Sequence, residues 1–386
     1  MESNSPAWLE APLSTLLMDP GRMATGRTCH TALRLGYLYG GAPDQDPETP
    51  KSIQTHQKPT RWGLRMTFLF YLIAIPLLIL WIPILIPCFI VAGYKQVKIS
   101  KKLGVSQTAI EIIHARYTMH VFGLRNDPYS VSLAEALPNA APRAVVLSIY
   151  PLLLAHKITG QYRIYMRKPA VGSENVGDMV PVRTSHIDGF LRKLLPDVTN
   201  FVSLGAGMDT RSLLFRHEDI HAIEIDQAHN QEFKLSILET LQDDYSSVCY
   251  IPVDFESDDL FAKLGESGSF AVDRPTAYLW EGVTLYLSEE AVRKTLRTLK
   301  EESAPGSHLI CDFYSLKFLK TLRKAPGAST LEATGEDLRF GLDFTSEWED
   351  RLRMFIESEG LTLTEARFLG ARRRSGPFMA VVCISF

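Results

Sequence analysis

The chain has 386 residues, of which 46% are hydrophobic and 22% are charged, and its net charge is -3 at pH 7. This composition is that of a globular protein with a substantial core, and it excludes a disordered chain. The slightly acidic balance, without a long basic run, gives no reason to expect a nucleic-acid partner. The five cysteines form no C-x-x-C pair and no Cys/His cluster with zinc spacing, so we expect no metal site.

Residues 1–62 are rich in Pro, Gly, Ser, Thr and other polar residues, a composition typical of a flexible leader. No basic segment followed by an apolar one stands at Met1, so we do not expect a signal peptide there. The leader is therefore expected to end near residue 62.

An uncharged stretch follows, from Met66 to Tyr94. A run of about 20 apolar residues is enough to span a bilayer. Basic residues flank this stretch on both sides: Arg61, Arg65, Lys95, Lys98, Lys101 and Lys102. We expect residues 63–95 to be a transmembrane or membrane-embedded segment in contact with lipid, either a single span or a hairpin in one leaflet. A buried core helix is disfavoured because the stretch has no polar face. The excess of lysines on the C-terminal side favours a cytoplasmic catalytic domain.

The region 106–181 is expected to be a helical cap on the substrate side. Within 108–139, apolar residues recur at helical spacing, and we interpret His114 and His120 as residues of the helix surface. The apolar run 144–155 is too short to span a bilayer, so we interpret it as a core or cap element.

From residue 182 to residue 386, short apolar runs alternate with helical patterns. Strands are expected at 201–204, 221–226, 248–254, 276–281 and 308–314, and two more at 362–368 and 378–386. Helices are expected at 182–195, 231–242, 289–302 and 348–359. Strands that alternate with helices, followed by a terminal pair of strands, predict a doubly wound α/β sheet that is mostly parallel, with one antiparallel hairpin at its edge.

A glycine turn follows the first of these strands, at Gly205 and Gly207. Strand, glycine turn and helix form a layout that lets the backbone come close to a bound nucleotide. Asp226 follows about 20 residues after the first glycine, where such a sheet places a carboxylate for a ribose hydroxyl. A nicotinamide-dependent reductase is a weaker alternative, because Thr210 stands where the reductase fingerprint has Gly or Ala.

Four motifs in this order resemble the leucine carboxyl methyltransferase family. They are LGAGMDTR (204–211), EID (224–226), IPVDF (251–255) and EGVTLYLSEEAV (281–292). The resemblance covers residues 183–386. It implies the Rossmann-like fold of class I methyltransferases and S-adenosylmethionine as the cofactor.

The resemblance also implies roles for single residues on the methionine side of the cofactor. Arg183 looks like the family arginine that reaches the cofactor carboxylate. Gly205, in the same turn as Gly207, looks like the glycine against which the methionine part lies. Glu281 looks like the acid near the amino group. These residue types suit the charges they would meet, since an arginine fork pairs with a carboxylate and an acid with an ammonium.

On the nucleoside side, Asp226 looks like the acid that binds the ribose hydroxyls, and Asp254 and Phe255 look like the pair that flanks the adenine. Tyr286, just beyond the fourth strand, is our candidate for a residue near the reacting methyl group. No residue is assigned as an essential base.

We expect an S-adenosylmethionine-dependent O-methyltransferase that acts on a carboxyl group of a small or lipophilic acceptor. A carboxylate needs no base but does need an anchor, which Arg116, Arg125 or the run Arg372 to Arg374 could supply. One alternative is a protein C-terminal leucine carboxyl methyltransferase, although phosphatase-directed members of the family have no comparable apolar segment. The other is a catalytically silent, membrane-bound relative that serves as a binding protein.

Overall fold

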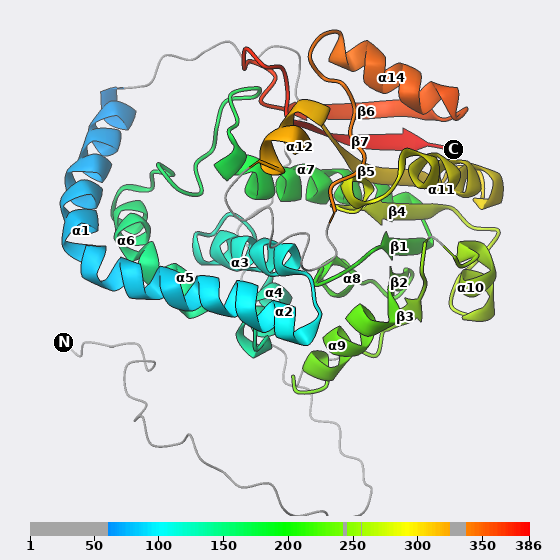
Figure 1. Ribbon diagram of the computed structural model, residues 1–386, viewed down its shortest axis with the longest axis horizontal. Coiled ribbons are helices and arrows are strands. Elements are labelled where there is room, and N and C mark those ends of the chain that lie inside the picture. The colour runs from blue at the N-terminus through cyan, green and yellow to red at the C-terminus, as the bar shows by residue number, and fades with distance from the viewer. Residues whose placement is uncertain (1–60, 242–244, 256, 325–336) are drawn as a thin grey trace, which may run out of the picture. The chain divides into compact units, whose positions relative to one another are not determined.

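The computed structural model describes residues 61–241, 245–255, 257–324 and 337–386 (Figure 1). They fall within one compact unit, which spans Pro59–Phe386. Residues 1–60 of the predicted leader lie outside the described residues, as do 325–336.

The described residues build one seven-stranded sheet with the order β3-β2-β1-β4-β5-β7-β6. Its strands are β1 (Asn200–Leu204), β2 (His221–Asp226), β3 (Val248–Pro252), β4 (Thr276–Trp280), β5 (His308–Tyr314), β6 (Thr362–Leu369) and β7 (Met379–Ser385). The first five strands are parallel, and β7 is antiparallel to both β5 and β6. The predicted mostly parallel α/β sheet with an antiparallel edge hairpin is therefore confirmed.

The chain winds outward from β1 through β2 to β3 and then crosses back to place β4 on the other side of β1. Ser203 of β1 thus lies opposite Glu224 of β2 and Leu279 of β4. In open sheets of this kind, ligands bind in the crevice at the carboxyl ends of the strands where the winding reverses. The edge formed by the ends of β1, β2 and β4 is therefore where a site is expected.

Helices cover both faces of the sheet (Figure 1). One face is covered by α10 (Leu260–Glu266), α11 (Glu289–Glu302) and α14 (Trp348–Ser358), and the other by α7 (Met179–Leu194), α12 (Leu316–Leu322) and α9 (Ala228–Leu238). Side chains alternate along β1, so Val202 and Leu204 join the first layer while Phe201 joins the second. All five residues of β1 are buried, because helices cover the sheet on both sides.

Four further helices precede the sheet in the chain: α3 (Gln107–Val121), α4 (Pro128–Ala136), α5 (Pro142–Ser148) and α6 (Tyr150–Thr159). Ser106 caps α3, and Asp127 caps α4 by accepting the backbone N–H of Ser130. Ile110 of α3 and Leu133 of α4 pack in one cluster with Leu213. The predicted helical region, 106–181, is helical up to Thr159 and irregular at 160–175, and its role as a substrate-side cap stays a prediction.

The interpretation of His114 as a surface residue is wrong. Its side chain is only 6% exposed, and its Nε2 accepts a hydrogen bond of 2.8 Å from the backbone N–H of Ala141. Burial, together with the charge of Lys95, lowers the pKa of His114 to about 4. His120 is half-buried, and its Nδ1 accepts from the backbone N–H of Asp127 at 3.1 Å.

The uncharged stretch forms the helix α1 (Arg61–Tyr94), which continues through the π-helix η1 (Lys95–Ile99) into α2 (Ser100–Leu103). Among the described residues, this continuous segment is the one helix long and apolar enough to cross a membrane. Figure 1 shows that α1 bends, as expected for a helix that contains prolines. Its Phe70 and Ala74 are buried in a cluster with Leu152 of α6. α1 therefore packs against the cap.

Candidate active site

The glycine loop joins β1 to the short helix α8 (Arg211–Leu214). Gly205 and Gly207 have φ of +68° and +47°, in the left-handed region that favours glycine. A Cβ at Gly205 would lie 2.5 Å from Cγ2 of Val283, so a larger residue there must displace that side chain. The backbone N–H groups of Gly205 and Ala206 both donate to the carbonyl of Ile225, at 2.8 and 2.9 Å. The loop is therefore held against the end of β2.

Asp226, the last residue of β2, holds the same loop from the other side. Its carboxylate accepts the backbone N–H of Gly207 at 2.6 Å, that of Gln227 at 2.7 Å and the side-chain amide of Asn230 at 2.9 Å. A carboxylate offers about four acceptor positions. Three are used here, so Asp226 retains room for one further donor.

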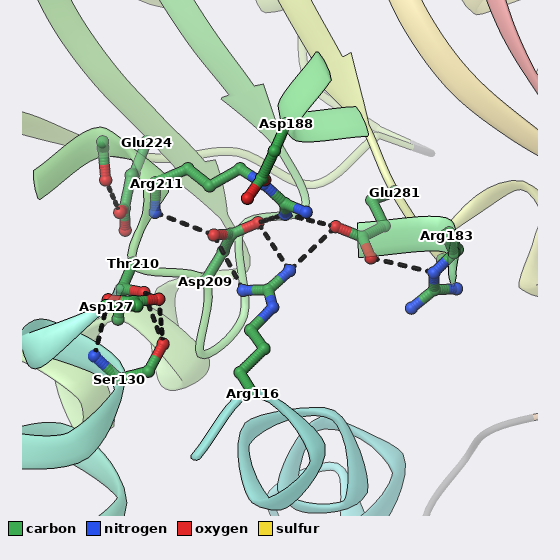
Figure 2. A network of polar contacts seen from close by, with 12 residues as sticks. Arg116, Asp127, Ser130, Arg183, Asp188, Asp209, Thr210, Arg211, Glu224 and Glu281 are labelled. Carbon is green, nitrogen blue, oxygen red and sulfur yellow. Dashed lines mark hydrogen bonds and ion pairs between the residues drawn. The ribbon is translucent and has the colours of Figure 1, made fainter. Parts of the chain in front are cut away.

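Glu281 follows directly after β4, and three arginines converge on it (Figure 2). Its carboxylate lies 2.8 Å from Nε of Arg183, 2.9 Å from Nη2 of Arg116 and 2.5 Å from Nη1 of Arg211. These arginines come from α7, α3 and α8. Burial alone would raise the pKa of Glu281, but the charges of Arg211, Arg183 and Arg116 outweigh it and lower the pKa below its usual range. Glu281 is thus a carboxylate at neutral pH.

Asp209 of the glycine loop lies between two of these arginines. Its oxygens are 2.8 Å from Nη1 of Arg116 and 2.6 Å from Nη1 of Arg211. Burial opposes ionisation, yet the two guanidinium groups lower the pKa of Asp209 strongly. The loop after β1 and the acid after β4 are therefore joined through shared arginines.

A third carboxylate, Asp188 of α7, extends the network away from Glu281. It lies 2.7 Å from Nε of Arg211 and 2.7 Å from Nε of Arg125. Arg125 also pairs with Asp127, the cap of α4. Burial, with the charges of Arg211 and Arg116, lowers the pKa of Arg125 to about 10. Arg125, predicted as a possible acceptor anchor, pairs with these two carboxylates and keeps Nη2 buried without a hydrogen-bond partner among the described residues, so its role as an anchor stays a prediction.

Two residues of β5 hold Arg183 and were not predicted. Nη1 of Arg183 lies 3.0 Å from Asp312 and 2.5 Å from the hydroxyl of Tyr314. Asp312 also accepts the backbone N–H of Gly282 at 2.9 Å. Burial raises the pKa of Asp312 despite the nearby Arg183. Their spacing could have linked these two residues in the sequence, since residues two apart on a strand share one face.

The structure brings several of the predicted cofactor residues together. Arg183 contacts Glu281, and Gly207 contacts Asp226. Gly205 lies against Val283, two residues after Glu281. These residues occupy the ends of β1, β2 and β4 and one turn of α7.

Asp254 and Phe255 lie outside this cluster. The third strand ends at Pro252, two residues earlier than predicted, and Asp254 is exposed. Phe255 packs against the core and lines a cavity of about 590 Å³ between α10 and α11. Of the residues predicted to bind the cofactor, that cavity includes Phe255 alone.

Tyr286 lies in a 3-10 turn, η4 (Thr284–Tyr286), and its hydroxyl is 3.2 Å from Oγ1 of Thr108 at the start of α3. It thus connects the sheet to the cap. The run Arg372 to Arg374 is exposed in the turn between β6 and β7, consistent with a solvated turn. Within the described ranges, no group of three or more His, Cys, Asp or Glu side chains is placed to hold a metal ion.

Residues 108–300, half of the chain, match the family model described as "Leucine carboxyl methyltransferase". The chain belongs to the leucine carboxyl methyltransferase family. The match begins in α3 and ends in α11, so it includes both the arginine-bearing cap helix and the strands β1 to β4.

Relatives within this family are mycobacterial proteins whose names mark them as candidate S-adenosyl-L-methionine-dependent methyltransferases. The chain is 35% identical to one from Mycobacteroides abscessus over 216 residues, which cover 55% of this chain and 65% of the relative. It is 28% identical to one from Mycolicibacterium vanbaalenii over 218 residues, which cover 55% of this chain and 67% of the relative. The matched region thus spans about two thirds of the length of these relatives.

A solved structure of a candidate methyltransferase from Thermobifida fusca is 13% identical, with a TM-score of 0.40, and the match covers 66% of this chain and 91% of that one. The family assignment rests on the sequence matches. For the matched region, they confirm the predictions that the chain is a methyltransferase and that its cofactor is S-adenosylmethionine. The same sequence matches argue against the alternative of a nicotinamide-dependent reductase.

Proposed function

We propose that the protein transfers a methyl group from S-adenosylmethionine to a carboxyl group of a small, lipophilic acceptor, and that it does so at a membrane. The observation that carries the proposal is the convergence of Arg116, Arg183 and Arg211 on Glu281 at the carboxyl edge of the sheet. Arg116 and Arg211 each keep one buried nitrogen without a hydrogen-bond partner among the described residues, and such donors suit an anionic acceptor.

The residues at this edge fit the cofactor by their chemistry. We propose that Arg183 holds its carboxylate, Glu281 its ammonium and Asp226 its ribose hydroxyls, with Gly205 and Gly207 leaving room for the backbone to approach. Oε1 of Glu281 is paired with one arginine donor, whereas a carboxylate oxygen can accept two hydrogen bonds. Glu281 can therefore serve Arg183 and an ammonium together. Bound there, the cofactor supplies a methyl group that its sulfonium has already activated.

We propose that Asp254 and Phe255 lie on the adenine side, as in the family pattern. Asp254 is exposed and Phe255 is half-buried, so a ligand at the end of β3 could reach both.

The acceptor anchor is proposed to be Arg116, the arginine that the cap contributes. Nε of Arg116 and Nη2 of Arg211 are buried without a hydrogen-bond partner among the described residues. Buried donors without partners are costly, and an acceptor carboxylate would satisfy them. Tyr286, at the junction of cap and sheet, is proposed to lie near the reacting methyl group.

A carboxylate acceptor also agrees with the acid–base properties of the site. A phenol would need a base to remove its proton. Asp209 and Glu281 have lowered pKa values and are held by arginines, which makes them poor bases. A carboxylate is already ionised at neutral pH, so the protein needs only to position it and exclude water.

The proposed membrane association rests on α1, with its uncharged length and its basic flanks. The larger number of lysines after α1 favours the cytoplasmic side for the catalytic part. An acceptor that dissolves in lipid would then be concentrated next to the enzyme.

The test uses the full-length protein in mixed micelles of detergent and lipid, with S-adenosylmethionine labelled in its methyl group. The acceptors are lipophilic carboxylic acids, phenols of matched size and a peptide that ends in leucine. We expect label in the carboxylic acids in a form released by mild base, because methyl esters hydrolyse and aryl methyl ethers do not.

Replacing Arg116 with Lys should raise KM for the acid more than it lowers kcat. Base-stable label on phenols alone, or no transfer by folded protein that binds S-adenosylhomocysteine, would overturn the proposal.

A further inference from the structure

The exposed apolar side chains of this protein are concentrated on one part of it. Of the 24 large hydrophobic side chains that are exposed among the described residues, 15 belong to α1 and six lie in the cap between Leu147 and Val176. Only three lie elsewhere. Soluble proteins rarely expose a large contiguous apolar patch unless it is an interaction surface. The surface of α1 and the adjacent cap therefore requires a partner.

α1 buries a narrow stripe against the cap and exposes most of its remaining surface. One side is buried against the cap at Phe70, Ala74, Cys88 and Ala92, positions separated by whole helical turns. The other side is exposed, with Phe68 at 70%, Ile79 at 62% and Ile90 at 65%. We call the exposed apolar residues of α1, together with Leu147, Tyr150 and Ile158, the outer face.

Contacts from the middle to the end of the helix tie α1 to the rest of the unit. Nε1 of Trp81 donates to the carbonyl of Leu147 at 2.8 Å, and its ring is stacked on Tyr150 at 5.7 Å. Nζ of Lys95 donates to the carbonyl of Ala140 at 3.0 Å. Such contacts are incompatible with a helix that leaves the cap and is surrounded by lipid on all sides.

A span that kept these contacts would carry α5 and α6 into the bilayer. α5 includes Arg143, which is exposed, and α6 includes His156 and Lys157 near its end. Ionisable side chains are costly at the bilayer centre. A helix that lies flat avoids this cost, since only its outer face enters the lipid.

The charges around the outer face fit a phospholipid surface. Exposed arginines stand at the start of α1, at Arg61 and Arg65, and exposed lysines follow its end, at Lys98, Lys101 and Lys102. Trp62 and Tyr94 mark the two ends of the apolar stretch, as aromatic residues do at membrane interfaces. Basic residues at both ends of an apolar helix are attracted to the negative surface of a bilayer that contains anionic lipid.

We propose that α1 lies in the plane of an anionic lipid bilayer, with the outer face inserted into one leaflet and the chain before and after α1 on the same side. The protein is then monotopic, attached to one leaflet without crossing it. The proposal rests on the membrane association in the proposed function and not on methyl transfer, so its tests read location and topology.

The first test is the topology of the full-length chain with an epitope tag at each end. The chain is synthesised in a cell-free system that contains sealed vesicles of phosphatidylcholine and phosphatidylserine. Protease is then added to the outside of the vesicles. We expect the protein to float with the vesicles in high salt and to lose both tags. A single protected tag that becomes cleavable in detergent would establish a span and overturn the in-plane arrangement, while leaving the proposed membrane association intact. Protein that does not float, including a soluble dimer that covers this face, would overturn both.

The second test distinguishes a flat helix from a hairpin that enters and leaves one leaflet, which also exposes both tags. A Trp81→Cys, Tyr150→Cys pair should be joined by a short bismaleimide on the vesicles, because these rings are stacked. The control pair, Trp81→Cys with Met354→Cys on α14, should not be joined. Failure of the first pair in floated protein would mean that α1 leaves the cap, which overturns the proposal.

The third test concerns the outer face itself. Ile79→Asp with Ile86→Asp should reduce the fraction that floats by about tenfold or more, because both side chains are placed in lipid. The matched control is Val272→Asp with Met354→Asp, two exposed apolar residues outside the face, which should float like the unaltered protein. Omitting phosphatidylserine should weaken flotation of the unaltered protein. Equal flotation of both double variants would overturn the assignment of this face.

Discussion

Among the acids of the site, Glu281 pairs with the largest number of arginines. Three guanidinium groups contact its carboxylate, and a second acid, Asp209, shares two of them. In a buried site such groups are poorly screened, so the removal of one negative charge leaves arginines that repel one another.

We expect Glu281→Gln, which keeps the size and loses the charge, to cost about 3–5 kcal/mol of unfolding free energy, the usual range for breaking a buried pair. Binding of S-adenosylhomocysteine should fall in the same variant. Denaturant unfolding and calorimetry measure the two effects. Glu359→Gln is the control, because Glu359 also contacts two arginines, Arg293 and Arg297, but on α11. It should leave binding unchanged. Unaltered binding by folded Glu281→Gln would contradict the role of this acid.

His114 predicts a pH dependence of stability. Its pKa of about 4 in the folded state lies below the ordinary 6.5, so the unfolded chain takes up the proton first as the pH falls. Its contribution is therefore complete above about pH 6.5 and is lost progressively toward pH 4, to the extent of about 3 kcal/mol. In His114→Gln, whose amide oxygen can still accept from Ala141, this decline should disappear. Unfolding midpoints between pH 7 and pH 4 test it, with exposed His217→Gln as a control that should keep the decline.

At the scale of elements, the loop from β1 to α8 depends on a close approach between Gly205 and Val283. Gly205→Ala should cost about 1 kcal/mol for its positive φ and a further 1–3 kcal/mol for overpacking. Gly268→Ala separates the two effects, because Gly268 has a similar φ of +66° and open space at its Cβ. Val283→Ala in the Gly205→Ala background should recover most of the difference. If Gly205→Ala costs no more than Gly268→Ala, the contact with Val283 does not constrain the loop.

The positions of the strands could be predicted from the sequence, but the burial of one cap helix could not. The strands of the parallel sheet were located to within about two residues, because their apolar runs are buried on both faces and end at turns. The burial of His114 could not be seen, because α3 packs between the sheet edge and the other cap helices and has almost no solvent side. An interpretation from helical periodicity assumes that a helix has a solvent-exposed side, and it assigns a polar residue such as His114 to that side.

The site was predicted only in part. Glycines and acids at the ends of strands can be read from position, since carboxyl ends of parallel strands meet at one edge. Arg116 was considered only as one of several possible anchors, because it lies far from Glu281 in sequence and only tertiary packing selects it. Asp312 and Tyr314 were missed for the same reason. The roles of the predicted cofactor residues stay predictions until ligand binding is measured.

At the scale of the whole molecule, a ligand that binds only the folded state raises stability by mass action. S-adenosylhomocysteine at a hundred times its Kd should stabilise the full-length protein by about 2.7 kcal/mol, and NADH should not. Asp226→Asn should reduce this shift, because the neutral amide is a poorer acceptor for ribose hydroxyls. The exposed Asp219→Asn is the control and should retain it. A full shift in Asp226→Asn would contradict the ribose assignment.

The position of Arg116 has a consequence for how the cap can move. Its helix belongs to the cap, but its charge is neutralised by Asp209 of the glycine loop and by Glu281, which follows β4. Lifting α3 away would separate a guanidinium from two carboxylates in a nearly dry environment, which costs far more than parting apolar surfaces. The cap is therefore not a freely hinged lid. Cap and sheet are expected to open as one cooperative unit, and entry to the site is expected to depend on water reaching these charges before the helices part.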